Sequence, residues 1–239
     1  MPNPLLTEIQ SLRDDSQAAV LSRFFKTGPG QYGEGDVFLG VKVPQARHVV
    51  KKYWQEVSFD NLSECLASQY HEVRLAALLT LVQIFKQATV KNDINLQRRC
   101  IDFYLAHIGA VNNWDLVDLS CYELLGTWLL DKDRSLLYQM ARHGKSIWEQ
   151  RIGIVSTMQF VRHGEIDDTL AIAEILLTHP HDLIHKAVGW LLREVGKRDR
   201  AALTVFLMAH KAAMPRTALR YAIEKYSPEE RRRWLAKRL

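Results

Sequence analysis

The stretch His185-Lys186-Ala187-Val188-Gly189-Trp190 carries a pattern that returns at three other places in the chain. At residues 73–78, 150–155 and 219–223, one basic residue again stands just before or within a small and apolar segment. The last three of these basic residues, Arg151, Lys186 and Arg220, are separated by 35 and 34 positions. This is the period of helical hairpins that stack into a solenoid, so the spacing predicts a repeat architecture.

Apolar residues at helical spacing continue along most of the chain, and strand-like alternation is nearly absent. Two short amphipathic helices are expected within residues 4–26, and another helix starts at Val43-Pro44, where proline suits the first turn. The longer helices are expected at His71 to Gln87, Asn112 to Leu130, Ser146 to Val161, Asp168 to Leu177, Asp182 to Gly196, Ala201 to His210 and Pro215 to Tyr226. The breaks between them are short, at His143-Gly144, His163-Gly164, residues 178–180, Gly196 and Pro215. The pattern predicts an all-α protein of antiparallel helix pairs.

Residues 27–36 form the one glycine-rich segment, which begins at Thr27 and ends at Asp36. No Gly-Lys-Ser/Thr follows, and no strand–turn–helix context supports a dinucleotide fingerprint, so the segment is interpreted as a turn-rich connector. We expect residues 1–239 to form a single domain, in which residues 1–36 supply the N-terminal helices and this loop.

Composition places the chain among ordinary globular proteins, with 47% hydrophobic and 25% charged residues. No early stretch has the pattern of an export signal, and no uninterrupted run of about 18 apolar residues predicts a membrane span. The three cysteines, Cys65, Cys100 and Cys121, are odd in number and far apart. They are typical of buried free thiols in a reducing cytoplasm rather than of a disulfide framework or zinc cluster.

The positive charge is concentrated near the C-terminus. From Asp182 to Leu239 there are 14 Lys/Arg against 6 Asp/Glu, a net charge of +8, so that the rest of the chain carries −3. The last residues include Arg231-Arg232-Arg233-Trp234 and Lys237-Arg238. A basic C-terminal region of this kind suits a polyanion as partner, although a solvated basic tail would have the same composition.

Equivalent positions in a stacked array form a column along one face. Stepping back 33 residues from Arg151 reaches Asp118, and a further 44 residues reaches Arg74. The expected column therefore consists of Arg74, Asp118, Arg151, Lys186 and Arg220. Spaced cations suit a phosphate backbone, whereas a carboxylate would repel it, so Asp118 is the member expected to act chemically rather than to hold DNA.

Trp114 and Asp118 are four residues apart, which places their side chains on one face of a helix. An anion beside a nucleotide sugar stabilises the oxocarbenium-like transition state of N-glycosidic cleavage, and it can also orient or deprotonate water. Trp114 and Trp190 can attract a cationic substrate through their ring faces. Arg151 can clamp a phosphate. The competing interpretation is a plain helix N-terminus with dipole-favoured acids and a core tryptophan.

Four segments in combination resemble the AlkD-like DNA alkylation repair glycosylases. They are residues 37–44, 114–118, 147–151 and 186–194, and the resemblance runs from about Val37 to Tyr226. It implies a HEAT-like α-solenoid with a concave basic groove that excises N3- or N7-alkylated, cationic purines from double-stranded DNA. Carried over by position, it also implies that Trp114, Asp118 and Trp190 surround the lesion nucleotide with Arg151 beside them.

Further DNA contacts are expected from Arg74, Lys186 and Arg220 of the column, from Arg193, and from Trp148, one turn before Arg151. The chemistry requires no cofactor, because a cationic purine is already a good leaving group. We expect a monomer that acts in the cytoplasm at the nucleoid and has no membrane partner.

Two other functions compete with this one. A non-catalytic HEAT-repeat protein could bind DNA structures or a protein partner along the same face, since solenoids are mostly scaffolds and a fold alone does not define an activity. A metal enzyme is the weaker alternative: His179, His181 and His185 cluster, but no Cys or acid stands at ligand spacing, and we expect no metal site.

Overall fold

The computed structural model describes residues 3–236 and is all-α, with 69% of the chain helical. Within those residues there is no strand, and one isolated bridge pairs Val37 with Tyr70. The expected fold class is confirmed. The chain divides into two compact units, Met1–Ser120 and Cys121–Leu239. The single-domain organisation of residues 1–239 stays a prediction.

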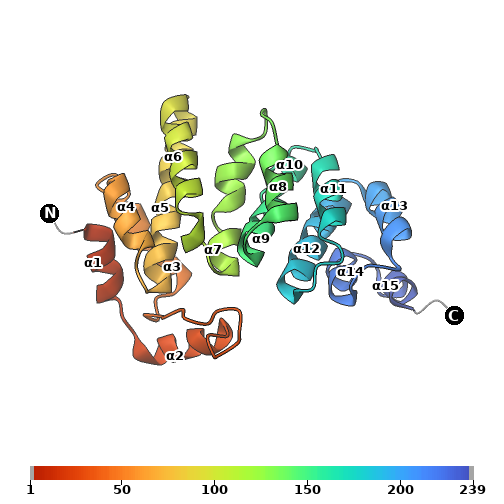
Figure 1. The fold of residues 1–239 in the computed structure, drawn as a ribbon, viewed down its shortest axis with the longest axis horizontal. Helices are drawn as coiled ribbons and strands as arrows, with labels where there is room; N and C mark the ends of the chain where they lie inside the picture. The colour runs from red at the N-terminus through yellow and green to blue at the C-terminus, as the bar shows by residue number, and fades with distance from the viewer. Residues whose placement is uncertain (1–2, 237–239) are drawn as a thin grey trace. The chain divides into compact units, whose positions relative to one another are not determined.

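The first unit is built around one long apolar helix, α5, which contacts α1, α3, α4, α6 and α7 (Figure 1). In the part of the chain that the structure describes, α5 alone is long and apolar enough to cross a membrane, but 72% of its apolar window is buried by its neighbours. It is therefore the core helix of this unit. The elements are α1 (Pro4–Ser11), α2 (Asp15–Phe24), α3 (Val43–Tyr53), α4 (Phe59–Leu66), α5 (His71–Val90), α6 (Ile94–Ala106), the 3₁₀ turn η1 (Ile108–Ala110) and α7 (Trp114–Asp118).

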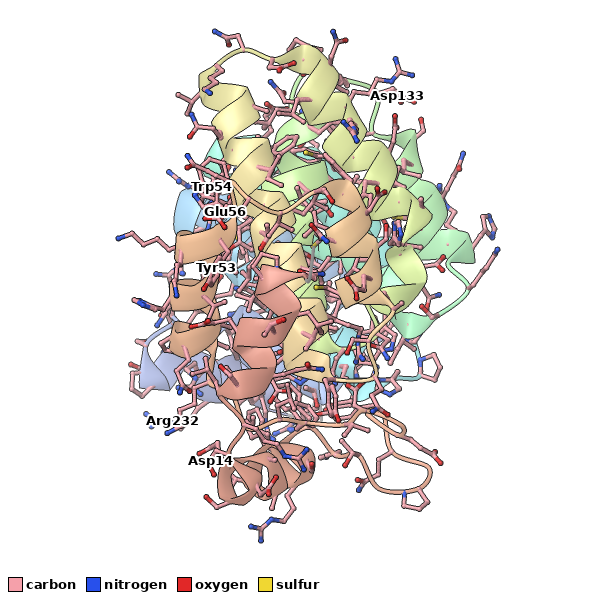
Figure 2. The ribbon with its side chains drawn as sticks, turned by 90° about the vertical axis from the view of Figure 1, so that its left-hand side faces the viewer. Asp14, Tyr53, Trp54, Glu56, Asp133 and Arg232 are labelled. Carbon is pink, nitrogen blue, oxygen red and sulfur yellow. The ribbon has the colours of Figure 1, made fainter. Side chains whose placement is uncertain are left out.

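Local sequence signals start several of these helices. Asn3, Asp14 and Ser58 each accept a backbone N–H from the first turn of α1, α2 and α4, which satisfies donors that have no partner within the helix. Pro44 lies in the first turn of α3, as expected. At the other end of α3, the Tyr53 hydroxyl donates to a carboxylate of α1 (3.1 Å), which ties the two helices together (Figure 2).

The second unit is layered. Helices α8 and α9 pack as a hairpin, and α9, α12 and α14 follow one another as neighbours, with α11 and α13 against α12. Its elements are the π-helical turn η2 (Tyr122–Gly126), α8 (Ser135–His143), α9 (Ile147–Val155), α10 (Met158–Arg162), α11 (Asp167–Ile175), α12 (Asp182–Arg198), α13 (Arg200–His210), α14 (Arg216–Ala222) and α15 (Pro228–Leu235). The 34- and 35-residue spacings therefore connect positions on three neighbouring helices.

A glycine allows α12 and α14 to approach closely. A Cβ atom on Gly189 would lie 2.5 Å from the Cβ atom of Tyr221 and would also overlap the carbonyl oxygen of Ala218. Real side chains do not reach such distances, so a larger residue at this position would push the two helices apart. The small residue before Trp190 in the repeat is thus explained by packing.

Three expected helices differ from those in the structure. The helix expected over residues 112–130 is interrupted at Leu119 and Ser120, where the Ser120 hydroxyl donates to the carbonyl oxygen of Leu116. The helix expected over residues 146–161 divides at Ser156 and Thr157, and the helix expected from Pro215 to Tyr226 ends at Ala222, the last residue of α14. Conversely, α12 continues through the expected break at Gly196, because the missing Cβ makes room for Leu203 of α13.

Candidate functional site

Two of the five residues of helix α7 are expected site residues that remain accessible, and the other three residues of the helix are buried. Trp114 and Asp118 are half-buried at its two ends, whereas Asp115, Leu116 and Val117 face the interior. Their four-residue separation brings the indole and the carboxylate to one side of the helix, as the sequence indicates. The accessible part of α7 thus consists of a ring and an acid.

Aromatic residues support Trp114 from the N-terminal segment. Its indole stacks on Phe25, with ring centroids 5.2 Å apart and an interplanar angle of 19°. The edge of Phe24 lies 6.0 Å away, and Phe25 stacks in turn on Phe38 at 5.0 Å. Phe24 is 61% exposed although it is a large apolar residue. The Trp114 ring is therefore held in a fixed orientation beside an accessible aromatic edge.

A buried charged network lies against α7. The His71 imidazole is 2.8 Å from a carboxylate oxygen of Asp115 and 3.2 Å from one of Asp36. Burial would lower the pKa of His71, but hydrogen bonds and charges from the two carboxylates outweigh this effect and raise the pKa to about 9. An imidazolium bridging two aspartates therefore links α5 to α7 and to the glycine-rich loop at neutral pH.

Residues at both ends of the glycine-rich loop contact residues at the start of α7. Phe25, just before the loop, stacks on Trp114, and Asp36, its last residue, accepts a 2.8 Å hydrogen bond from the side-chain amide of Asn113, which also caps α7. Burial would raise the pKa of Asp36, but hydrogen bonds from His71 and Asn113, together with the charge of Arg74, lower it. The loop acts as a structural brace for the start of α7.

Arg74 belongs to this network rather than to an accessible cationic column. It is 6% exposed, its guanidinium pairs with Asp36, and it donates to the carbonyl oxygen of Ser68 at 2.8 Å. A buried arginine committed to a carboxylate does not present its charge to a phosphate. The structure therefore corrects the interpretation of Arg74 as a DNA contact and assigns it a structural role.

Glu72 was not predicted as an important residue, yet it anchors the segment that follows the loop. Its buried carboxylate accepts the backbone N–H groups of Leu39, Gly40 and Val41 at 2.9, 2.8 and 3.1 Å. Gly40 has a φ of 92°, a conformation that favours glycine. The available sequence signal was an acid in the first turn of a helix whose later residues are mostly apolar.

In the second unit, Arg151 joins two neighbouring helices. It is 5% exposed, and its Nη1 donates to the carbonyl oxygen of Leu183, in the first turn of α12, at 2.5 Å. Trp148, one turn earlier on α9, is half-buried. Arg151 therefore fixes the start of α12 against α9, beside the helix face that carries Lys186 and Trp190.

The expected residues of α12 follow one face of the helix. Lys186, Trp190, Arg193 and Lys197 are spaced by four, three and four positions. Lys186 forms an ion pair with Asp182 at 2.8 Å, and Arg193 pairs with Glu194 at 3.2 Å and with Glu224. Trp190 is half-buried and lines a cavity between α10 and α12. Lys197 extends this cationic face beyond the residues chosen from the sequence.

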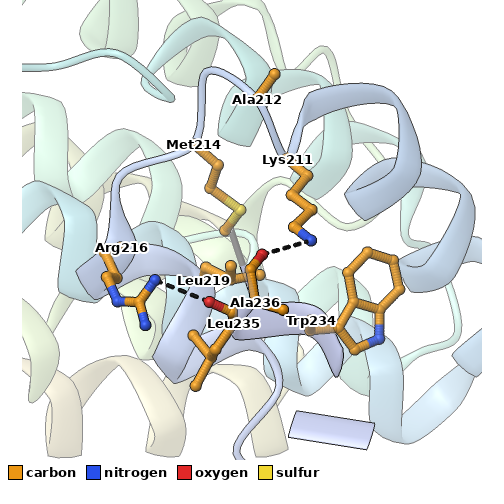
Figure 3. A pocket seen from close by; sticks show the side chains of 8 residues that line it. All are labelled: Lys211, Ala212, Met214, Arg216, Leu219, Trp234, Leu235 and Ala236. Atoms are coloured by element: carbon orange, nitrogen blue, oxygen red, sulfur yellow. Dashed lines mark hydrogen bonds between the residues drawn. The ribbon is translucent and has the colours of Figure 1, made fainter. Parts of the chain in front are cut away.

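The C-terminal cations are placed differently from one another. Arg220 lies exposed in the last turn of α14. Trp234 lines an apolar cavity of about 290 Å³ with Met214 and Leu219, and the Lys211 amine lies 5.8 Å from its ring centroid (Figure 3). Lys237 and Arg238, part of the expected basic ending, lie outside the described residues.

The three clustered histidines form hydrogen bonds around the start of α12. His181 Nδ1 accepts the backbone N–H of Leu183 at 3.1 Å, His185 Nε2 donates to the carbonyl oxygen of His179 at 2.5 Å, and His179 is hydrogen bonded to Gln150 at 2.9 Å. Burial lowers the pKa of both His179 and His181. Between residues 3 and 236, no three His, Cys, Asp or Glu residues are grouped to hold a metal ion.

Packed helical hairpins with basic residues along α12, together with an accessible tryptophan–aspartate pair on α7, define an all-helical protein with charged and aromatic groups at accessible positions. A family model described as DNA alkylation repair enzyme matches residues 5–226. The chain therefore belongs to the DNA alkylation repair enzyme family, which confirms the resemblance seen in its motifs.

The fold is similar to that of a solved structure. That structure is described as a predicted DNA alkylation repair enzyme from Enterococcus faecalis, is 16% identical, and superposes with a TM-score of 0.67 over 90% of this chain and 97% of that chain. No curated protein sequence matches the chain. Family membership indicates an enzyme of DNA repair that acts on alkylated DNA.

Proposed function

We propose that the protein is a DNA glycosylase that hydrolyses the N-glycosidic bond of N3- and N7-alkylated purines in duplex DNA. Membership of the DNA alkylation repair enzyme family supports alkylated DNA as the substrate, and the accessible Trp114–Asp118 pair on α7 is the observation that supports the reaction class. The proposed catalytic residues are Asp118, Trp114 and Trp190, and the buried Arg151 is proposed to act as a positioning residue that fixes the start of α12. Those proposed to contact DNA are Lys186, Arg193, Arg220 and Trp148.

The reaction requires few catalytic groups because alkylation already activates the substrate. Alkylation at N3 or N7 gives the purine a positive charge, so the departing base needs no proton from a general acid. The tryptophan faces attract such a cation by roughly 0.5–2 kcal/mol each, depending on how far water is excluded. We assign this recognition to Trp114, whose ring is fixed by Phe25, and to Trp190.

Asp118 is assigned to the sugar rather than to the base. As the bond between C1′ and the base nitrogen breaks, its electron pair leaves with the purine and positive charge develops on the deoxyribose. A carboxylate next to the sugar stabilises that charge and holds a water molecule, whose oxygen then bonds to C1′. The water proton is transferred to the carboxylate or to solvent, and the product is an abasic site.

The test is release of N7-methylguanine from a duplex oligonucleotide, measured chromatographically under single-turnover conditions. Asp118→Asn keeps the size of the side chain but removes its charge, and we expect the release rate to fall on the order of 100-fold or more. Affinity for unmodified DNA should not fall. A wild-type protein that binds DNA but releases no base would contradict the proposal and favour a non-catalytic DNA-binding scaffold.

Substitution of the other residues separates recognition of the cationic base from affinity for DNA. Trp114→Phe and Trp190→Phe should lower the release rate more than DNA affinity, because each keeps a ring but weakens the attraction for a cation. Arg151→Lys should lower both, since a single ammonium cannot replace the guanidinium fork that fixes α12. Equal losses of rate and affinity in the two tryptophan variants would argue against cation recognition.

A further inference from the structure

A cavity of about 440 Å³ opens between the ends of α10 and α12, beside Trp190. Both helices contribute cations to it from their last turns. None of these cations was selected as a DNA contact from the sequence. The residues that line the cavity are Met158, Val161, Arg162, Trp190, Glu194, Lys197 and Arg198.

Two arginines on the rim carry charge that no acid neutralises. Arg162 and Arg198 are both exposed, and among residues 3–236 neither has a carboxylate within ion-pair distance. Arg198 donates to the carbonyl oxygen of Arg162 at 3.1 Å. Arg162 lies over the Tyr122 ring at 4.8 Å and donates to Gln159 at 3.3 Å. Neutral groups thus position both guanidinium groups and leave their charge for an external anion.

The remaining charges keep the cavity positive. Lys197 lies 2.8 and 2.7 Å from the two carboxylate oxygens of Glu194, and Arg193 shares the same carboxylate at 3.2 Å. The lining therefore contains three cations and a single acid, and that acid is already paired with two cations. A bound anion would meet a net positive field.

The rest of the lining is apolar. Trp190 is accompanied there by Met158 and Val161. Cations at helix C-termini also favour the helix dipole, which explains why basic residues stand at these positions. The dipole does not account for an aromatic and aliphatic wall facing the same cavity. A phosphodiester with its deoxyribose matches both parts, since the arginines suit the phosphate and the wall suits the sugar.

We propose that this cavity binds the sugar–phosphate backbone of DNA, with Arg162 and Arg198 on a phosphate beside Trp190. The identity of the ligand rests on the proposed action on DNA. The site extends the DNA contacts of α12 from Lys186 and Arg193 to the far end of the helix. It binds backbone irrespective of base sequence.

The first test measures the salt dependence of binding to an unmodified duplex by fluorescence anisotropy. Each neutralised phosphate changes affinity by about 3.5-fold over a fourfold range of salt. Because both arginines are placed on one phosphate, Arg162→Gln combined with Arg198→Gln should reduce the salt effect on affinity by about 3.5-fold. The matched control is Arg142→Gln, an exposed arginine in the last turn of α8 that lies over Tyr138 at 5.5 Å. A double variant that resembles this control would overturn the proposal.

The second test distinguishes DNA backbone from a small anion. Trp190 emission, taken as the difference between wild type and Trp190→Phe, should change on addition of an unmodified oligonucleotide but not of inorganic phosphate at equal ionic strength. An equal response to phosphate would indicate a simple anion site and refute backbone binding. Both tests use unmodified DNA, so their failure is separate from failure of the wild-type protein to release N7-methylguanine.

Discussion

The charged network behind α7 predicts a loss of stability at alkaline pH. His71 is buried between Asp36 and Asp115, and its pKa is raised from 6.5 to about 9. A group whose pKa is raised by folding stabilises the folded state fully below its unfolded pKa, and this contribution disappears as the pH rises through the folded pKa. Stability from His71 is therefore present below pH 6.5 and is lost between 6.5 and 9.

The magnitude follows from the two pKa values. Each pH unit between them corresponds to about 1.36 kcal/mol, so the full contribution is about 3.4 kcal/mol. Roughly 2.5 kcal/mol of it is lost between pH 6.5 and 9, because the unfolded state is half protonated at the lower limit and the folded state at the upper. The His71 side chain is only 2% exposed, so solvent does not screen the two carboxylates from it. A loss of this size is a large fraction of the stability of an ordinary domain.

Urea unfolding at a series of pH values measures this effect, and the resonances of the His71 ring report its pKa directly. Asp115→Asn removes one of the two carboxylates and should reduce the pH dependence by about half, because Asp36 remains. His48→Gln, at an exposed position of α3, is the control and should leave the dependence unchanged. Parallel pH profiles in wild type and Asp115→Asn would refute the charged state assigned to His71.

Three further substitutions test the packing around the site, each by urea unfolding. Gly189→Ala should cost about 1–3 kcal/mol because a Cβ would strike the backbone of α14, whereas Gly109→Ala, with open space around it, should change stability by less than about 0.5 kcal/mol. Phe25→Ala should cost about 3 kcal/mol and loosen Trp114; a loss below about 1 kcal/mol would contradict the stacked arrangement. Glu72→Gln should cost about 2 kcal/mol, because three backbone N–H groups lose a charged acceptor, and an unchanged unfolding curve would show that the carboxylate is dispensable.

Features that depend on nearby residues were predictable from the sequence. The four-residue spacing of Trp114 and Asp118 places them on one side of α7, and the 34- to 35-residue period predicts that the helices of Arg151, Lys186 and Arg220 are neighbours. Both follow from helix geometry, because the period of a helix and the length of a hairpin are set by the backbone. The helix start at Pro44 is a local signal of the same kind.

Whether a charged side chain is buried in an ion pair or exposed was not predictable from nearby residues. Arg74 and Arg162 look alike in the sequence, yet Arg74 is buried against Asp36, 38 residues away, whereas Arg162 is exposed and bonded to neutral groups. No local pattern identifies a partner at that distance, because loop closure brings together residues whose separation is unrelated to helical period. The same holds for His71, which becomes an ionic bridge only when Asp36 and Asp115 meet it in the folded unit.

The sequence by itself determined that the chain is helical, that its helices repeat, and that α7 carries a ring and an acid on one side. The tertiary structure alone decided which cations are available to DNA and which belong to the core. The physical reason is that helical periodicity is a property of the local backbone, whereas burial and ion pairing depend on contacts between distant segments.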